Sequence, residues 1–469
     1  MTTRPSDDTL NRLAAVVGEK YAIRDRDAMQ AYMREWRDLW HGESPVVLRP
    51  ASTSEVSQIL AIAHETGTAI VPQSGNTGLV GGQIPREKRH EVLLSLDRMT
   101  RIMSVDAADN TITVEAGATL KSVQDAADAV NRLFPLSLAS EGSCRIGGNL
   151  STNAGGLNVI AYGNTRDLCL GLEVVLADGR VWDGLRRLRK NNSGYDLKDL
   201  FIGAEGTLGI ITAAVMKLYP KPNSYETAFI AVPDPDAALG LLSLAREMSG
   251  DRVMAFEIIP ELAMGFTVKH MGVRHPLSEP SPWYILSELA DPPEGTFMRI
   301  LEAAMERGFV TDATVAQSGA QRQEIWAIRE LMPESQKFEG GSIKHDISVP
   351  VSKVPQFLAE ADAAVYRAVP GARIMAYGHM GDGNIHYNVS QPVGMDKKAF
   401  LDNWKPVNDG VFEVALRLDG SISAEHGIGQ LKRDYMPLIK SPVELAMMYD
   451  VKRTLDPKGI LNPGRVLPE

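Results

Sequence analysis

The pattern of apolar and polar positions in the first half of the chain alternates between short apolar runs, typical of strands, and wider spacings, typical of helices. Residues 56–63 carry apolar side chains at helical spacing directly after Ser52-Thr53-Ser54-Glu55, which predicts a helix that begins with a capping box. The Asp178-Gly179 pair between apolar runs predicts a hairpin turn. Strands and helices mix without a regular order, which favours an α+β domain. The expected strands lie at 69–72, 92–96, 111–115, 170–177 and 180–182, with a helix at 120–133.

The composition changes near Tyr219-Pro220-Lys221-Pro222, where two prolines in a short polar stretch predict a domain boundary. Beyond this boundary, two strand–helix–strand sets predict an antiparallel sheet backed by helices, ferredoxin-like in style. The first set lies at 226–232, 237–248 and 253–259, and the second at 283–289, 297–307 and 311–315. We therefore expect domains at 1–222 and 223–420, followed by a C-terminal segment at 421–469.

The chain of 469 residues is 44% hydrophobic and 23% charged, which is typical of an ordinary soluble globular protein of two or three domains. Its formal net charge of −10 argues against a nucleic-acid-binding protein or a polybasic membrane-surface protein. Its two cysteines, Cys144 and Cys169, are too few for a disulfide framework, so we expect reduced thiols and a cytoplasmic location. The start lacks the pattern of a signal peptide, and the longest charge-free stretch, 146–165, is too polar for a transmembrane segment.

Three glycine-rich segments in the first half indicate a ligand. The loop Pro72-Gln73-Ser74-Gly75-Asn76-Thr77-Gly78-Leu79-Val80-Gly81-Gly82 has glycines three residues apart, where backbone can approach an anion closely. Taken alone this loop is typical of a surface turn, and it matches neither the Walker A nor the GxGxxG pattern. Residues 147–156 and 203–212 have the same small and polar composition, however. Three such segments exceed what turns need, so we expect backbone N–H groups to hold an extended ligand with a pyrophosphate.

The segment Tyr377-Gly378-His379-Met380-Gly381-Asp382-Gly383-Asn384-Ile385-His386-Tyr387-Asn388 suggests a metal site. A hairpin at Asp382-Gly383 would place its two histidines on adjacent strands, where directly opposed Cβ atoms lie about 5 Å apart. Glu425 and His426 add a carboxylate and another imidazole downstream. Two imidazoles and a carboxylate can bind a divalent metal and leave positions for substrate. The alternative is a pair of hydrogen-bonded structural histidines, and spacing alone favours that alternative.

The glycine-rich segments, together with the closing motif Lys452-Arg453-Thr454-Leu455-Asp456-Pro457-Lys458-Gly459-Ile460-Leu461-Asn462-Pro463-Gly464, resemble flavoproteins of the vanillyl-alcohol-oxidase type. The similar branch includes glycolate oxidase subunits, D-lactate dehydrogenases and D-2-hydroxyglutarate dehydrogenases, and the resemblance extends over nearly the whole chain. It implies an α+β fold with a two-part FAD-binding domain, a ferredoxin-like substrate domain and a C-terminal segment that returns to the flavin. The first loop has neither the His nor the Cys that attaches flavin covalently in some relatives, so non-covalent FAD is expected. The implied FAD-binding residues are Pro72, Gln73, Ser74, Gly75, Asn76, Thr77, Gly78, Leu79, Gly82, Gly142, Gly147, Gly148, Asn149, Ser151, Thr152, Asn153, Gly155, Gly156, Tyr162, Glu205, Gly206, Gly209, Ile210, Ile211 and Asn462.

The resemblance also implies a metal and a catalytic base. Positions that match His379, His386 and Glu425 hold a divalent metal in D-2-hydroxyglutarate dehydrogenases and metal-dependent D-lactate dehydrogenases, and Zn²⁺ is the expected ion. The position that matches Asn388 contacts substrate. The position that matches His426 contacts substrate and is the proposed base, so His426 is the expected catalytic residue.

Arg329 and Lys344 match positions that bind the distal carboxylate of the substrate in D-2-hydroxyglutarate dehydrogenases. Arginine suits a bidentate carboxylate contact, and lysine supplies a second positive charge. A Thr that some members use there is replaced by Pro333. The expected substrate is therefore D-2-hydroxyglutarate, with D-malate possible. A D-lactate dehydrogenase or a glycolate oxidase-type subunit is the alternative.

The implied reaction oxidises a D-2-hydroxy acid to the 2-oxo acid, with the metal on the hydroxyl and C1 carboxylate and hydride passing to flavin N5. No nicotinamide fingerprint or iron–sulfur cysteine cluster is present, so the expected electron acceptor is an external electron-transfer flavoprotein or quinone-linked carrier. A homodimer is the common default. Two other classes stay open: a flavin-independent metallohydrolase, which leaves the glycine-rich segments unexplained, and a flavin-bearing transferase or subunit without net oxidation.

Overall fold

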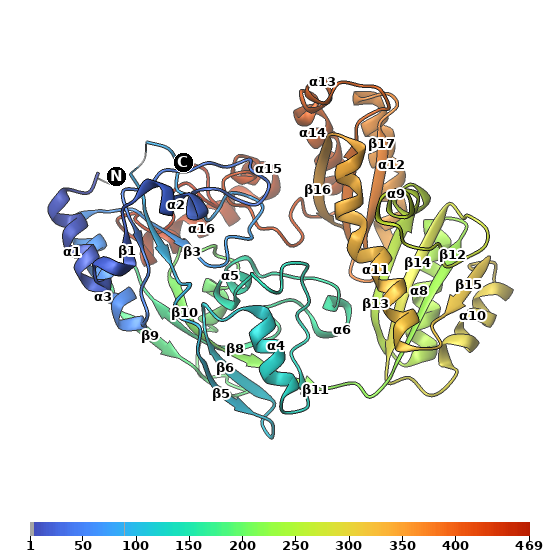
Figure 1. The fold of residues 1–469 in the computed structure, drawn as a ribbon, viewed down its shortest axis with the longest axis horizontal. Helices are drawn as coiled ribbons and strands as arrows, with labels where there is room; N and C mark the ends of the chain where they lie inside the picture. The colour runs from blue at the N-terminus through green and yellow to red at the C-terminus, as the bar shows by residue number, and fades with distance from the viewer. Residues whose placement is uncertain (1–3, 89) are drawn as a thin grey trace. The chain divides into compact units, whose positions relative to one another are not determined.

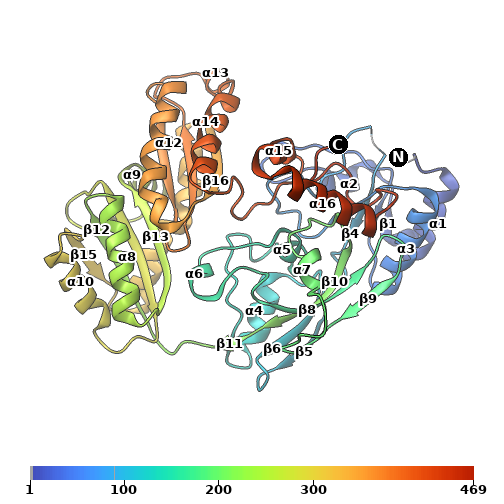
Figure 2. The ribbon, with the colours of Figure 1, turned by 180° about the vertical axis from the view of Figure 1, so that it is seen from behind.

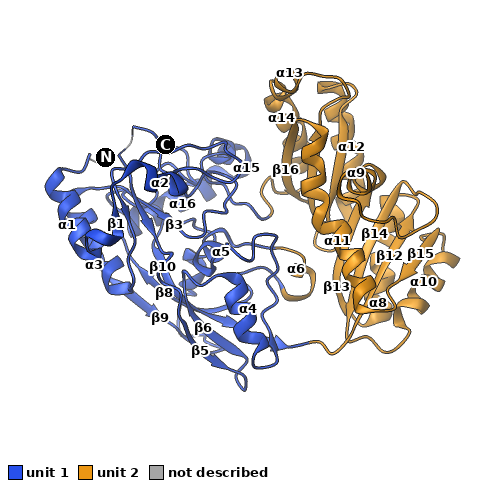
Figure 3. Cartoon of the chain, in the orientation of Figure 1, with its two compact units in different colours: residues 1–155, 163–221, 425–469 blue, residues 156–162, 222–424 orange. Residues whose placement is uncertain are grey.

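Contacts within the chain divide the computed structural model, which describes residues 4–88 and 90–469, into two units (Figure 3). Unit 1 comprises residues 1–155, 163–221 and 425–469, and unit 2 comprises residues 156–162 and 222–424. The sequence predicts divisions after residues 222 and 420, whereas the contacts divide the chain after 221 and 424 and assign 156–162 to unit 2. Among the described residues, no helix is long and apolar enough to cross a membrane.

Unit 1 contains two larger sheets with helices packed against them (Figure 1), as expected for a two-part domain. One is a four-stranded mixed sheet in the order β1 (Ala22–Ile23), β2 (Val47–Leu48), β4 (Val92–Ser95), β3 (Ile70–Gln73). The other is a five-stranded antiparallel sheet in the order β5 (Ile102–Asp106), β6 (Thr111–Glu115), β10 (Ile210–Lys217), β8 (Cys169–Val175), β9 (Val181–Gly184). The pairing of β8 with β9 confirms the hairpin predicted at Asp178-Gly179.

The two helices that the sequence predicts in unit 1 are both present, each with one difference. Ser52 caps α3 through a bond from the Glu55 N–H, but the Glu55 carboxylate accepts from the N–H of Ala51 rather than from Ser52, so the predicted capping box is only half formed. The helix expected at 120–133 ends at Asp128, because Asn131 adopts a φ of +55° and turns the chain into a strand. That strand, β7 (Arg132–Leu133), pairs with β11 (Tyr219–Pro220). The helices are α1 (Asp7–Val17), α2 (Arg26–Met33), α3 (Thr53–Thr66), α4 (Leu120–Asp128), α5 (Ile146–Thr152) and α7 (Lys198–Phe201).

The C-terminal segment of unit 1 returns to the N-terminal sheet. The N–H of Ile70 donates to the carbonyl of Ile460 at 2.8 Å, and the N–H of Asn462 donates to the carbonyl of Ile70 at 2.8 Å. Residues 460–462 thus extend the edge of the sheet beside β3. Before that point the segment forms α15 (Met436–Ile439) and α16 (Pro442–Leu455), drawn in dark red in Figure 2. The Lys452 ammonium at the end of α16 donates to carbonyl oxygens of Thr207 and Leu461.

Unit 2 contains one seven-stranded antiparallel sheet in the order β15 (Asp312–Val315), β12 (Tyr225–Val232), β14 (Trp283–Ala290), β13 (Val253–Pro260), β17 (Arg373–His379), β18 (Asn384–Ser390), β16 (Ser342–Ser348). The first four strands follow the split β-α-β order and confirm the predicted ferredoxin-like arrangement. The last three strands extend the sheet beyond β13. The helices are α6 (Val159–Tyr162), α8 (Pro235–Ser249), α9 (Glu261–Met271), α10 (Thr296–Glu306), α11 (Gly319–Ser335), α12 (Val354–Ala368), α13 (Lys397–Leu401) and α14 (Trp404–Arg417).

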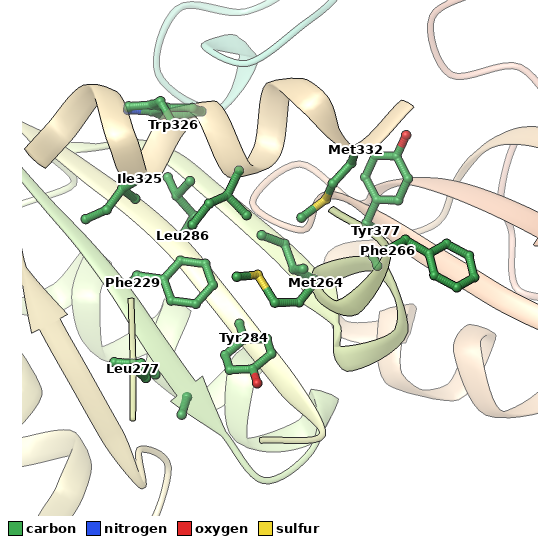
Figure 4. Close-up of a cluster of buried hydrophobic side chains, with 14 of the residues drawn as sticks. Phe229, Met264, Phe266, Leu277, Tyr284, Leu286, Ile325, Trp326, Met332 and Tyr377 are labelled. Atoms are coloured by element: carbon green, nitrogen blue, oxygen red, sulfur yellow. The ribbon is translucent and has the colours of Figure 1, made fainter. Parts of the chain in front are cut away.

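A core cluster fills the space between one face of this sheet and the helices α9 and α11 (Figure 4). Phe229 and Tyr284 stack with their ring centroids 5.1 Å apart, and Leu286 of β14 is fully buried between strands and helices. Met264 of α9 and Trp326 of α11 complete the contact from the helix side. Burial of these large side chains fixes both helices on the face of the sheet that also carries the polar residues described below.

We predict that Leu286→Ala lowers the free energy of unfolding by about 2–5 kcal/mol, because the substitution leaves a cavity in the cluster of Figure 4. Met298→Ala on α10 is the matched control, since Met298 is 50% exposed and its truncation should cost less than about 0.5 kcal/mol. Urea denaturation of both variants measures the difference. Equal losses in the two variants would contradict the placement of this core.

Candidate active site

The glycine-rich segments expected to bind FAD lie against one another within unit 1. A Cβ at Gly75 would lie 2.3 Å from the carbonyl oxygen of Ser143, which is closer than any side chain allows. A Cβ at Gly148 would lie 3.0 Å from the Cβ of Ser74. The first loop therefore packs against the backbone of Ser143 through Gly75 and against the second segment through Ser74 and Gly148, and the contact at Gly75 is one that only glycine permits.

The third segment closes against the other two. The N–H groups of Gly203 and Glu205 donate to the carbonyl oxygens of Leu150 and Ser151, at 2.9 and 2.8 Å. A Cβ at Gly206 would lie 2.4 Å from Cγ of Pro72, at the start of the first loop. Segments far apart in the sequence thus form one continuous backbone surface.

Several polar groups on this surface lack a protein partner. In the part of the chain that the structure describes, the backbone N–H groups of residues 74–79 have no protein acceptor. Ser74 Oγ and Asn462 Oδ1 are buried without a hydrogen-bond partner among the described residues. Buried polar groups are normally satisfied, so these groups indicate a ligand. A run of neutral N–H donors suits a pyrophosphate, and the residues present therefore fit FAD.

The side chains of the first loop also brace the loop itself. Gln73 Nε2 donates to the carbonyl of Tyr32 at 2.9 Å, and Asn76 Nδ2 donates to the carbonyl of Arg34 at 2.8 Å. Gln83 Nε2 donates to the carbonyl of Gly78 at 2.9 Å. Thr77 and Leu79 are half-buried. The loop is thus held to α2 and its surroundings by amide side chains.

The second segment is partly helical, and its polar side chains form hydrogen bonds within the protein, while their predicted contact with FAD stays a prediction. Residues 146–152 form α5, and the hydroxyls of Ser151 and Thr152 donate to backbone carbonyls one turn earlier. Asn153 Oδ1 accepts from the N–H of Arg166, and Asn149 is buried. These side chains stabilise the segment. Gly142 lacks the close contacts seen at Gly75 and Gly148, since an added Cβ there would meet nothing within 4 Å.

Glu205 and Asn462 fasten the C-terminal segment to the glycine-rich surface. The Glu205 carboxylate accepts from the N–H groups of Ile428 at 2.7 Å and Gly429 at 2.9 Å. Burial raises the pKa of Glu205, and these two N–H groups oppose the rise. Asn462 Nδ2 donates to the carbonyl oxygens of Gly82 and Glu205, at 3.2 and 2.7 Å. The carboxylate of Glu205 therefore contacts protein, and its predicted role toward FAD stays a prediction.

The remaining residues predicted to bind FAD are distributed over both units. Gly209, Ile210 and Ile211 lie at the start of β10, where both isoleucines are buried. Gly147 and Gly155 belong to unit 1, whereas Gly156 and Tyr162 belong to unit 2. Their contribution to a flavin site stays a prediction.

In unit 2, the two histidines lie on the sheet face covered by α11. β17 and β18 form the expected hairpin, but Tyr377 rather than His379 lies opposite His386. The prediction of directly opposed histidines is therefore wrong, because the connection between the strands takes the four residues 380–383 instead of two. The histidines are diagonal neighbours, and their rings meet edge to face with centroids 5.2 Å apart.

A buried carboxylate that the sequence analysis did not single out lies beside them. Glu257 of β13 lies directly opposite His379 and is fully buried. Its Oε1 lies 2.6 Å from His379 Nδ1, and its Oε2 accepts from Arg329 Nε at 2.6 Å. Burial favours a raised pKa, but the charges of His379 and Arg329 outweigh it and lower the pKa of Glu257 to about 2. Arg329 also lies 4.8 Å from the centroid of the Tyr377 ring.

The predicted metal ligands are close enough to share one ion. One ligand atom from each of His379, His386 and Glu425 lies within 4.8 Å of the other two. Glu425 reaches this position along the chain, because the preceding Ala424 donates its N–H to the carbonyl of Asp346 on β16. Two imidazoles and a carboxylate at this spacing fit a divalent metal such as Zn²⁺. Asp346, Glu425 and His426 form a second group of the same kind.

The predicted substrate residues of the second half share the same sheet face. Lys344 lies opposite Asn388 on the pair β16–β18, and Asp346 lies opposite His386. Asn388 is buried and Lys344 is half-buried. Arg329 projects from α11 toward β13, as its bond with Glu257 shows, and Pro333 lies one turn further along the same helix. A role of these residues in substrate binding stays a prediction.

Glu257 and Asp346 are the residues of this region that sequence reasoning missed. Each carried a usable signal. Glu257 is the single charged residue in the otherwise apolar strand 253–260, and a carboxylate is almost never fully buried unless it is paired. Asp346 alternates with Lys344 and Ser348 along the sequence, and only the pairing of β16 with β18 shows that it lies opposite a histidine.

The whole chain is similar to known flavoproteins. Residues 221–466 match the family described as the C-terminal domain of FAD linked oxidases, and residues 44–184 match the family described as an FAD binding domain. The mitochondrial D-2-hydroxyglutarate dehydrogenase of Arabidopsis thaliana is 40% identical over 458 residues, which are 97% of this chain and 80% of that protein. The D-2-hydroxyglutarate dehydrogenase of Xanthomonas citri pv. viticola is 37% identical over 441 residues, which are 93% of this chain and 92% of that protein.

A solved structure supports the fold. The structure of p-cresol methylhydroxylase with substrate bound superposes with a TM-score of 0.77 at 16% identity and covers 98% of this chain and 97% of that one. The likeness confirms the expected fold of the vanillyl-alcohol-oxidase type. With a family match over residues 221–466 and relatives that align over nearly its whole length, the chain belongs to the family of FAD-linked oxidases, and within it groups with proteins named D-2-hydroxyglutarate dehydrogenase.

Proposed function

We propose that this protein is an FAD-dependent dehydrogenase that oxidises D-2-hydroxyglutarate to 2-oxoglutarate, with D-malate as a second substrate. The observation that carries the proposal is the polar sheet face of unit 2, where potential metal ligands lie beside an arginine and a lysine that suit a second carboxylate. The relatives that align over nearly the whole chain have this activity in their names.

Different residues of the chain would bind the flavin and the metal. The N–H groups of residues 74–79 and the backbone of 142–155 would hold non-covalent FAD, which accepts a hydride from the substrate Cα when bound. His379, His386 and Glu425 would hold a divalent metal, expected to be Zn²⁺, which lowers the pKa of the substrate hydroxyl when bound. The same ion would also hold the C1 carboxylate of the substrate.

His426 is the proposed base, and its neutral imidazole would take the hydroxyl proton at one ring nitrogen. Asn388 would orient the substrate from the adjacent strand. Arg329 and Lys344 would bind the distal carboxylate, and the charge of both residues suits a dianionic substrate. Electrons would leave the flavin for an external carrier, an electron-transfer flavoprotein or a quinone-linked protein. A homodimer and a cytoplasmic location complete the proposal.

For the flavin, we predict that Gly75→Ala weakens FAD binding by about 5- to 150-fold, because overpacking by one methyl group costs about 1–3 kcal/mol. The added Cβ would overlap the carbonyl of Ser143. The flavin-to-protein absorbance ratio after dialysis measures the loss. Gly319→Ala, where a Cβ meets nothing within 4 Å, is the control and should retain FAD. Full retention of FAD in Gly75→Ala would rule out the placement of FAD on this loop.

For the metal, we predict that His386→Asn weakens Zn²⁺ binding more than about 100-fold, since changes to residues that only support metal ligands already cost about 10- to 100-fold. Removal of the metal by a chelator should likewise abolish turnover of the wild type, and added Zn²⁺ should restore it. His41→Asn, at a side chain that is 53% exposed in unit 1, is the control. Persistent turnover after complete metal removal would contradict the assignment.

For the substrate, we predict that Arg329→Ala lowers kcat/KM for D-2-hydroxyglutarate by about 10- to 150-fold more than kcat/KM for D-lactate. A charge-assisted contact contributes about 1.5–3 kcal/mol, and D-lactate has no distal carboxylate to lose it. Steady-state kinetics with both substrates measures the ratio, in which general damage to the site cancels. An unchanged ratio would show that Arg329 does not bind the distal carboxylate.

A further inference from the structure

The Glu257 carboxylate occupies an unusual place in unit 2. It lies in the middle of a buried sheet, on β13, and is fully buried. Its two oxygens bind two different elements: Oε1 lies 2.6 Å from His379 Nδ1 on β17, and Oε2 accepts from Arg329 Nε on α11 at 2.6 Å. A buried carboxylate with one oxygen for each of two donors fixes both donors at once.

The contact with His379 has a chemical consequence. An ionised carboxylate accepts hydrogen bonds only, so the proton of the neutral imidazole belongs on Nδ1. The other oxygen of Glu257 accepts from the Arg329 guanidinium at 2.6 Å, which favours the ionised carboxylate. Nε2 is then the ring nitrogen with a lone pair, and a lone pair is what a metal requires.

The contact with Arg329 belongs to a larger attachment of α11 to the sheet. Arg322, Trp326 and Arg329 recur on one face of this helix. The first two donate to Glu288 of β14, with Arg322 Nε at 2.6 Å and Trp326 Nε1 at 2.9 Å. The third donates to Glu257. Two buried carboxylates therefore hold α11, but Glu288 has no contact with either site histidine among the described residues.

We propose that Glu257 is a positioning residue that orients His379 toward a divalent metal and Arg329 toward the substrate through the two oxygens of one carboxylate. The part that concerns the metal and the substrate rests on the proposed function. Because both contacts share one group, a change at Glu257 reaches both the metal ligand and the arginine. Glu288 provides a matched comparison, since it is equally buried and binds the same helix.

The first experiment titrates Zn²⁺ into FAD-loaded protein that a chelator has stripped of metal, and follows binding by calorimetry. Glu257→Gln keeps the shape of the side chain, but its amide oxygen can accept from only one donor while its NH₂ group faces the other. We expect this variant to bind Zn²⁺ about 10- to 100-fold more weakly than the wild type. Glu288→Gln should retain wild-type affinity. Equal affinity in the wild type and Glu257→Gln, or equal weakening in both variants, would overturn the proposal.

The second experiment is independent of the metal. In protein with ¹⁵N-labelled histidine, His379→Gln identifies the ring signals of His379, and flavin absorbance confirms that each variant is folded. We expect the wild type to show the Nδ1-protonated form, Glu257→Gln to lose it and Glu288→Gln to keep it. An unchanged His379 signal in Glu257→Gln would overturn the positioning role. If the wild type bound no Zn²⁺, the metal assignment of the proposed function would fail, whereas the role of Glu257 would be decided by this signal.

Discussion

The pairing of the buried Glu257 carboxylate with His379 and Arg329 is the interaction that holds the polar face of unit 2 together. A charge in the middle of a sheet is costly unless it is fully paired, and here one imidazole and one guanidinium pair it. The same pairing aligns β13, β17 and α11, which together contribute the histidine and the arginine of the candidate site. His379 and Arg329 therefore both stabilise the buried carboxylate and belong to the candidate site.

In unit 1, the groups suited to bind an anion are backbone N–H groups rather than charged side chains. The protein has a formal net charge of −10, yet among the residues that the structure describes the N–H groups of 74–79 in the first glycine-rich loop have no protein acceptor. Close contacts at Gly75 and Gly148 bring these segments together, and the Asn462 amide joins them to the C-terminal segment. The capacity to bind an anionic cofactor is thus local and does not depend on the net charge.

Much of this could be predicted from the sequence, because glycine spacing and strand–helix order are local properties. The ferredoxin-like strands and the hairpin after Asp178 were expected from the pattern, whereas the closeness of His379, His386 and Glu425 was expected only from the family resemblance. Non-local pairing could not be predicted. The register of β17 and β18 depends on a four-residue connection, and the opposition of Glu257 and His379 joins strands that are more than a hundred residues apart in sequence. The hydrogen bonds from the Ser151 and Thr152 hydroxyls to backbone carbonyls likewise could not be predicted, because the helix α5 was not expected from the sequence.

Under the proposed function, a D-2-hydroxy acid bound on the polar face of unit 2 reduces FAD held by unit 1. The decisive measurement is anaerobic mixing of the FAD-loaded protein with either enantiomer of 2-hydroxyglutarate, with flavin absorbance as the signal. We expect D-2-hydroxyglutarate to bleach the flavin in the presence of metal, the L enantiomer to leave the flavin oxidised, and chelation to stop the reaction. A flavin that stays oxidised with D-2-hydroxyglutarate, D-malate and D-lactate alike would show that the protein does not have this function.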